Sequence, residues 1–153
     1  MPKESAGLLM YRRTADQLEV LLVHPGGPFW KNKDAGAWTI PKGEIAPGEE
    51  PLATAQREFQ EEVGFEAKGP FLQLSPIQQK GGKIVHAWAF EGDCEPSQIK
   101  SNTFQIEWPP RSGRMTEFPE VDRAQFFTLD EARKRINPAQ AALLAESAQK
   151  VQF

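Results

Sequence analysis

The chain has 153 residues, 39% hydrophobic and 25% charged, a size and composition that fit one globular domain with its own core. Its formal net charge of −3 provides no global attraction for nucleic acid or an anionic membrane, so any recognition of phosphate must be local. The single cysteine, Cys94, excludes an internal disulfide framework and fits a reducing compartment. We therefore expect one cytoplasmic domain over residues 1–153, since the sequence shows neither an apolar leader nor a membrane-spanning run of roughly 20 residues.

The N-terminal part of the chain is predicted to be mostly β-structure. Residues 6–11 and 18–23 are short apolar runs on either side of a polar turn, which is the pattern of a β-hairpin. Residues 24–36 are rich in glycine, proline and polar side chains and read as a loop. A brief β-prone segment at 38–40 precedes a second loop, which ends at the Pro-Gly pair 47–48.

Residues 51–63 are predicted to form a helix. Pro51 suits the first helical turn, and Gly64 is the residue type that commonly ends a helix. Between them, an apolar stripe repeats at helical spacing and comprises Leu52, Ala55, Phe59 and Val63. We expect this stripe to pack on the core while the neighbouring arc of the helix faces a cleft.

Two further strands are predicted at residues 71–74 and 83–90, the second with alternating side chains. Residues 91–119 contain several prolines and read as a long irregular excursion, of the kind that often forms a binding loop or lid. Residues 124–127 are predicted to form the last strand.

The C-terminal part is predicted to be helical. Thr128 is a suitable N-cap for a helix that begins near Leu129, with acidic side chains in its first turn. Asn137 and Pro138 are predicted to start a final amphipathic helix that runs to about Lys150.

Three glutamates of the helix at 51–63 form an acidic arc. Glu58, Glu61 and Glu62 lie on one side, because helical positions three and four apart are neighbours. Like charges on one arc repel each other, so the pattern is either a solvated acidic face or a site for a divalent cation. Because the sequence has no His/Cys cluster nearby, the expected cation is Mg²⁺, with Mn²⁺ as the alternative, rather than zinc.

The arc is part of a longer pattern between Gly43 and Phe65. The order is Gly43, five residues, Glu49, seven residues, Arg57-Glu58, an apolar residue, any residue, Glu61-Glu62, any residue, Gly64 and an apolar residue. This segment resembles the Nudix box, and it meets every defined position. A chance match in such a chain has a probability on the order of 10⁻⁷. The resemblance implies an α/β/α sandwich with a central mixed sheet.

The resemblance also implies roles for the carboxylates. Glu58 and Glu62 are expected to bind the metal, and Glu61 is expected to be a ligand or the general base. A further catalytic carboxylate is expected from a late segment of the chain, where Glu120 matches best and Glu117 is the second candidate.

Other box residues are expected to be structural. Arg57 resembles the structural arginine of the family and is predicted to pair with Glu49, which would hold the loop against the helix. Gly43 is expected to let the loop turn tightly, and Gly64 is expected to end the helix.

Candidate substrate contacts lie outside the arc. Lys42 abuts the box, so its side chain is a candidate phosphate contact and its carbonyl a candidate metal ligand. Arg114 is a second candidate for phosphate. The aromatic residues that could stack on a nucleobase instead of packing in the core are Trp30, Trp88, Phe104 and Trp108.

The function implied by the resemblance is metal-dependent hydrolysis of a phosphoanhydride bond in a nucleoside diphosphate linked to another group. Residues 41–44, Pro-Lys-Gly-Glu, resemble the sequence of hydrolases of dinucleoside and diphosphoinositol polyphosphates. NTPs and dinucleoside polyphosphates are the expected small-molecule substrates. The alternatives are an RNA 5′-end pyrophosphohydrolase, which the net charge disfavours, and a non-catalytic nucleotide sensor, which a complete box disfavours.

Overall fold

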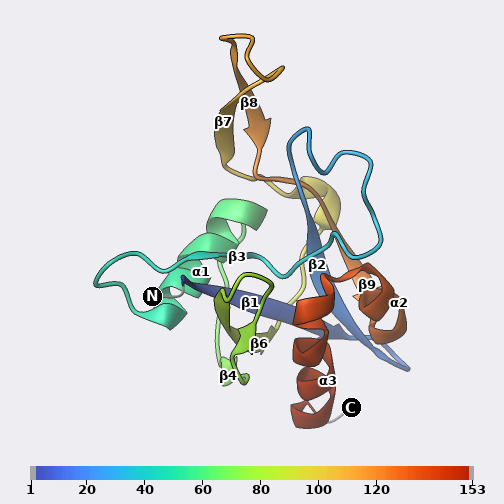
Figure 1. Cartoon of the computed structure of the whole chain (residues 1–153). Coiled ribbons are helices and arrows are strands. Elements are labelled where there is room, and N and C mark those ends of the chain that lie inside the picture. The colour runs from blue at the N-terminus through green and yellow to red at the C-terminus, as the bar shows by residue number, and fades with distance from the viewer. Residues whose placement is uncertain (1–2, 152–153) are drawn as a thin grey trace.

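The centre of the fold is strand β1 (Glu4–Arg13), which pairs with three other strands in the computed structural model that describes residues 3–151 (Figure 1). It pairs antiparallel with β2 (Leu18–Pro25), as the predicted hairpin requires. It pairs parallel with β6 (Ile84–Glu91) and antiparallel with the short β3 (Lys42–Glu44). The sheet is therefore mixed.

Three more strands complete a seven-stranded sheet, whose main order is β4-β6-β1-β2-β9. Strand β9 (Val121–Thr128) pairs antiparallel with β2, with a bulge between His24 and Pro25. The short strands β4 (Leu72–Gln73) and β5 (Ile77–Gln78) both pair antiparallel with β6.

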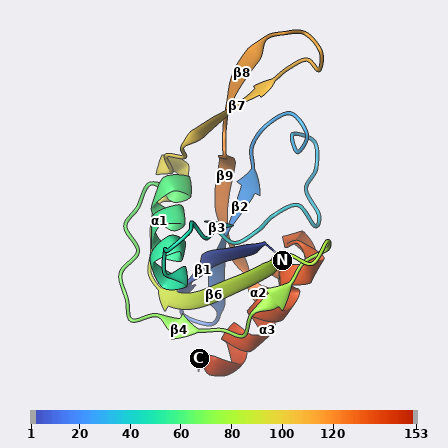
Figure 2. The same cartoon turned by 60° about the vertical axis from the view of Figure 1, so that its left-hand side comes forward.

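Helices cover both faces of this sheet (Figure 2). Helix α1 (Pro51–Val63) packs Ala55, Phe59 and Val63 into a core shared with one face. Helices α2 (Leu129–Arg135) and α3 (Ala141–Lys150) pack on the opposite face, around a second buried cluster. The predicted α/β/α sandwich with a mixed sheet is confirmed. Within residues 3–151, no helix has both the length and the apolar character needed to cross a bilayer.

The helix ends follow the local chemistry of the sequence. Helix α1 has the predicted bounds and ends at Gly64, whose φ of 86° is the left-handed conformation that glycine adopts without strain. The Thr128 side chain caps α2 by accepting a hydrogen bond from the Glu131 N–H at 3.3 Å. Asn137 caps a 3₁₀ turn at Pro138–Gln140, so α3 begins at Ala141, later than predicted.

The prediction that residues 91–119 form an irregular segment is wrong in part. This segment contains a 3₁₀ turn at Pro96–Gln98 and an antiparallel hairpin made of β7 (Thr103–Glu107) and β8 (Met115–Pro119). In Figures 1 and 2 this hairpin projects beyond the sheet. Its strands alternate half-buried and exposed side chains, a period-two pattern that the prolines and glycine between them obscured.

The segment that precedes α1 also differs from prediction. Lys42–Glu44 was predicted as loop but forms β3, because its backbone pairs with the start of β1. The β-prone residues 38–40 form only isolated bridges, between Val23 and Thr39 and between Trp38 and Ile136.

Candidate active site

Three carboxylates from two distant segments converge on one point. Glu58 and Glu62 lie one turn apart on α1, and Glu120 immediately precedes β9. One carboxylate oxygen from each residue lies within 4.8 Å of the others. The structure thus brings the late glutamate predicted from the sequence into contact range of the helix.

Backbone hydrogen bonds hold Glu120 in this position. Its N–H donates to the carbonyl of Asn102 at 2.8 Å, and its carbonyl accepts from the N–H of Gly26 at 2.9 Å. Asn102 in turn donates its N–H to the carbonyl of Glu61 at 2.7 Å, which ties the segment to the end of α1. Gly26 must lack a side chain here, since a Cβ would overlap the carbonyl of Pro119.

The other side of the cluster is formed by β3. The Lys42 backbone lies close enough to the Glu62 carboxylate to lower its pKa against the effect of burial, and Gly43 lies directly against the Glu58 carboxylate. Burial lowers the pKa of Lys42, with Lys83 adding repulsion, whereas Glu62 and Glu58 oppose this shift. The Lys42 side chain therefore lies in the electrostatic field of the cluster.

Arg57 organises the carboxylates around it. Its Nε and Nη2 donate to the two oxygens of Glu49, each at 2.9 Å, so the predicted pair is present and bidentate. Glu49 also accepts from the Thr54 hydroxyl at 2.7 Å, and these bonds lower its pKa to about 2. The Arg57 Nη1 lies 3.1 Å from both oxygens of Glu61 and 3.1 Å from one oxygen of Glu58. Glu61 therefore faces Arg57 and is not one of the three converging carboxylates.

The three converging carboxylates are electrostatically strained. Burial raises the pKa of Glu62 well above its ordinary value, and the charges of Glu58 and Glu120 raise it further. Burial also raises the pKa of Glu58 and of Glu120, with Glu61 as the next contributor in both cases. Among residues 3–151, no Lys or Arg forms an ion pair with Glu62 or Glu120.

This donor set fits a hard divalent cation. The three side chains offer oxygen ligands, and the group contains no imidazole or thiolate. Such ligands suit Mg²⁺ or Mn²⁺ rather than zinc. A cation would also neutralise the like charges that raise the pKa values of the carboxylates.

Three of the predicted substrate contacts, Trp88, Trp30 and Arg114, lie on different elements. Trp88, on β6, is half-buried and packs against the core beneath α1. Trp30 is exposed, and the Lys33 ammonium lies 5.2 Å from the centre of its ring. Arg114 is exposed in the turn between β7 and β8. Their roles in binding, like that of the Lys42 carbonyl, stay predictions.

A cavity of about 650 Å³ lies next to the cluster, between the loop after β2 and the β7–β8 hairpin. One of its lining residues, Pro119, immediately precedes Glu120 in the chain. Its lining residues are Gly27, Pro28, Lys31, Trp108, Thr116, Phe118, Pro119 and Asp122. The sequence analysis identified Trp108 but not Lys31 or Asp122. The only signals for these two were their positions in the sequence, Lys31 directly after Trp30 and Asp122 two residues after Glu120.

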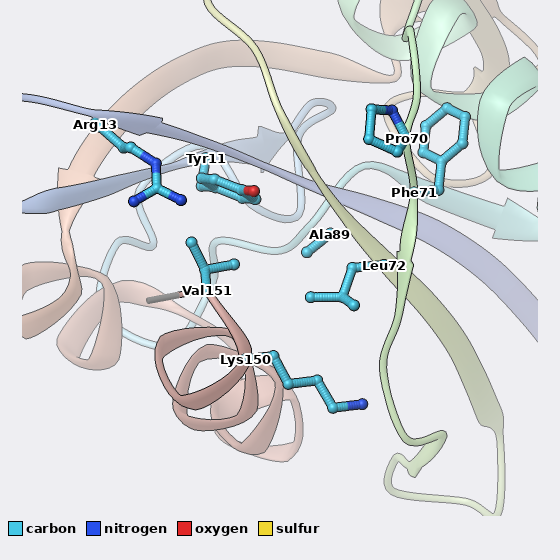
Figure 3. A pocket seen from close by; sticks show the side chains of 8 residues that line it. All are labelled: Tyr11, Arg13, Pro70, Phe71, Leu72, Ala89, Lys150 and Val151. Atoms are coloured by element: carbon cyan, nitrogen blue, oxygen red, sulfur yellow. The ribbon is translucent and has the colours of Figure 1, made fainter. Parts of the chain in front are cut away.

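A second cavity, of about 470 Å³, lies between β1, β4 and the end of α3 (Figure 3). Tyr11, Leu72 and Val151 face one another across it, with Arg13 and Lys150 at its margin (Figure 3). None of its lining residues belongs to the box or to the carboxylate cluster, so it is separate from the candidate active site.

Comparison with known proteins identifies relatives. A bis(5′-nucleosyl)-tetraphosphatase [asymmetrical] of Rattus norvegicus is 43% identical over 60 residues, which cover 35% of this chain and 41% of the rat protein. The protein of the same name from Sus scrofa is 60% identical over 103 residues, which cover 60% of this chain and 66% of the pig protein. The chain therefore matches less than two thirds of either relative.

The fold and the family are also identified. The crystal structure of a C. elegans Ap4A hydrolase binary complex has a TM-score of 0.68 at 22% identity, covering 95% of this chain and 96% of that chain. At this identity the likeness concerns the fold. A sequence model of the NUDIX domain matches residues 1–147. This match spans nearly the whole chain and contains the complete box, so the chain belongs to the Nudix family.

Proposed function

We propose that the chain is a metal-dependent pyrophosphohydrolase that cleaves a phosphoanhydride bond in a nucleoside diphosphate linked to another group. The observation that carries this proposal is the convergence of Glu58, Glu62 and Glu120 beside the box loop. The names of the rat and pig relatives make dinucleoside polyphosphates the first substrate class to test. Residues 41–44 also resemble the sequence found in hydrolases of dinucleoside polyphosphates.

The carboxylates would bind the metal, and the basic residues around them would position the carboxylates and the phosphate. Glu58 and Glu62 are the proposed ligands, and the Glu120 carboxylate lies beside them. A bound Mg²⁺ or Mn²⁺ would neutralise phosphate charge and lower the pKa of an attacking water. Arg57 orients Glu58 through a 3.1 Å hydrogen bond while it holds Glu49. The Lys42 ammonium, beside the cluster, is the proposed phosphate contact.

The proton of the attacking water needs an acceptor. Glu120 is the proposed acceptor, because it comes from a separate segment of the chain than the two helix ligands and burial raises its pKa above the ordinary value. Glu61 is the other candidate. Arg57 contacts both oxygens of Glu61, so that carboxylate faces Arg57 rather than the point where the other three converge.

The test is a substrate panel with Mg²⁺ for the parent protein, Glu62→Gln and Glu66→Gln. The panel contains diadenosine tetraphosphate, ATP, ADP-ribose and 5′-triphosphorylated RNA, with nucleotide products identified by chromatography. We expect the parent to cleave diadenosine tetraphosphate best. Glu62→Gln should lose at least about 10–100-fold of its apparent metal affinity. Glu66→Gln, an exposed change just beyond α1, should match the parent.

Two results would contradict this proposal. If the parent cleaves none of these substrates but binds nucleotides, the chain is a nucleotide sensor. If it prefers triphosphorylated RNA by more than about tenfold in kcat/KM, it acts on RNA 5′ ends.

A further inference from the structure

We infer that the cavity between the loop after β2 and the β7–β8 hairpin is a purine subsite, which holds the base of the nucleotide whose phosphates lie at Glu58, Glu62 and Glu120. This inference rests on the proposed function and adds recognition of the part of the substrate that carboxylates do not contact. The volume of the cavity, about 650 Å³, falls in the range of small-molecule sites.

Aromatic rings form the walls of the subsite and hold its two sides together. Trp108 and Phe118, from the hairpin, line the cavity. Phe29, from the loop, packs edge-on against Trp108 with 5.5 Å between ring centres. The ring of Phe104 lies against Gly27. Because the loop and the hairpin already contact each other at these two points, flat aromatic surfaces are available for a base to stack on.

Two charged side chains give the subsite a polar edge. Lys31 and Asp122 both line the cavity, so it offers hydrogen-bond donors and acceptors. Adenine and guanine carry amino donors together with ring nitrogen or carbonyl acceptors. Asp122 can accept from the amino group while Lys31 donates to an acceptor. Uracil has no amino group, so it satisfies this pair less well, and cytosine has the amino group but only a single ring for stacking on the aromatic walls.

A buried histidine positions Asp122. The Nδ1 of His24 lies 2.8 Å from the Oδ1 of Asp122, and its Nε2 lies 2.6 Å from the carbonyl oxygen of Lys33. The His24 side chain is fully buried, with Trp38 packed edge-on against it. His24 thus ties the β9 side of the cavity to the loop side, and it keeps one oxygen of Asp122 engaged.

The subsite and the catalytic cluster share neighbouring residues of the chain. Pro119 lines the cavity, and the next residue, Glu120, is one of the three converging carboxylates. Gly27 lines the cavity, and its neighbour Gly26 donates the hydrogen bond that holds the Glu120 carbonyl. The cavity therefore adjoins the carboxylates through residues that neighbour Glu120 in the chain and hold it by a hydrogen bond, which is the side on which a nucleotide bound at both would lie.

The first test measures steady-state hydrolysis of diadenosine tetraphosphate by Trp108→Leu and Phe118→Leu. We expect KM to rise about tenfold or more, as loss of base stacking predicts, while kcat changes less than about twofold. An unchanged kcat also shows that the variant is folded. Met115→Ala removes an exposed side chain from the same hairpin, outside the cavity, and should keep the parental KM. Parental KM values in both cavity variants would overturn the inference.

The second test concerns the base. We expect the parent to favour diadenosine and diguanosine tetraphosphate over diuridine tetraphosphate by about tenfold in kcat/KM. Asp122→Asn keeps an oxygen for His24 but loses the charged acceptor, so this preference should shrink to less than about threefold. Asp130→Asn, an exposed change on α2, should keep it. A parent without preference, or an Asp122→Asn variant with the full preference, would contradict a purine subsite.

A binding measurement separates failure of the subsite from failure of the proposed function. Equilibrium dialysis with AMP and UMP needs no catalysis and can use the parent and Trp108→Leu. If the parent hydrolyses nothing but AMP binds more weakly to Trp108→Leu, the subsite stands and the hydrolase proposal fails. If the parent hydrolyses the substrate while AMP binds equally to both proteins, the hydrolase proposal stands and the subsite fails.

Discussion

Gly43 and Glu58 lie so close together that only a hydrogen atom fits on the glycine. A Cβ at this position would overlap the carboxylate carbon and both oxygens of Glu58. Strand β3 and helix α1 can therefore approach closely, and the Glu58 carboxylate is held where it meets Glu62 and Glu120. The carboxylate cluster can therefore pack in this way only with glycine at this position of the box.

Substitution Gly43→Ala should displace the Glu58 carboxylate. We expect kcat/KM to fall by about 10²-fold, the cost of misplacing a catalytic group by about 1 Å. The Mg²⁺ concentration for half-maximal activity should rise. A Mg²⁺ titration of hydrolysis checks both, and a thermal melt confirms folding. A variant with parental Mg²⁺ dependence would show that Glu58 does not need this contact.

Glu120→Gln and Glu117→Gln form a matched pair for the late carboxylate. Glu120 belongs to the converging group, whereas Glu117 is exposed on β8. We expect Glu120→Gln to lower kcat by about 10²–10⁴-fold if it accepts the proton, with Glu117→Gln close to the parent. The pH dependence of kcat/KM checks the assignment. Equal activity in both variants would remove Glu120 from the mechanism.

Glu62→Gln should stabilise the metal-free protein at neutral pH. Because burial raises the pKa of Glu62, the folded state binds more protons than the unfolded state between pH 4.5 and that raised value. Stability in the parent therefore falls as pH rises through this interval. In chelator at pH 8 we expect the variant Tm to be about 2–4 °C higher, the effect of roughly 1 kcal/mol in a domain of this size.

Two conditions control this thermal measurement. Below pH 4.5 the protonated Glu62 resembles Gln, so the difference in Tm should vanish. Added Mg²⁺ should raise the Tm of the parent more than that of the variant, because a ligand that binds the folded state stabilises it. A variant that melts below the parent in chelator at pH 8 would contradict the electrostatic reading.

Arg57→Lys should weaken the hold on Glu49 in a pH-dependent way. Lys cannot reproduce the bidentate geometry. The pKa of Glu49 is lowered to about 2 in the folded state, so this contribution to stability is present above pH 4.5 and is lost as pH falls towards 2. We expect the variant to unfold at lower urea concentration at pH 7 and to approach the parent near pH 2.5.

The control for this pair is Arg133→Lys. Arg133 forms an exposed ion pair with Asp130 on α2, and exposed pairs contribute little. Its change should be smaller than that of Arg57→Lys at pH 7. An equal effect of the two substitutions would mean that the Arg57 pair has no special structural role.

Local chemistry made several elements predictable. Helix α1 begins at Pro51 and ends before Gly64, as predicted, because proline fixes a helical φ and glycine adopts the left-handed conformation of a helix end, whatever surrounds them. The cap at Thr128 and the β1–β2 hairpin are equally local. The pair between Arg57 and Glu49 was also anticipated, through the resemblance to the box.

Long-range pairing made other elements unpredictable. Strand β3 has only three residues and exists because β1 lies beside it, so no periodic pattern could reveal it. The β7–β8 hairpin is joined by a seven-residue connection, 108–114, whose prolines and glycine suggested an irregular segment. Its strands are held by each other and by contacts such as that between Phe29 and Trp108.

By itself, the sequence determined that Glu58, Glu61 and Glu62 share one side of a helix, since helical spacing depends only on local backbone geometry. Only the tertiary structure decided which carboxylates meet. Arg57 contacts both oxygens of Glu61 from one turn earlier on the helix, while backbone hydrogen bonds from Gly26 and to Asn102 hold Glu120 beside Glu58 and Glu62. These choices depend on packing between distant segments, and neither spacing nor composition encodes which of several acidic groups will face the same point in space.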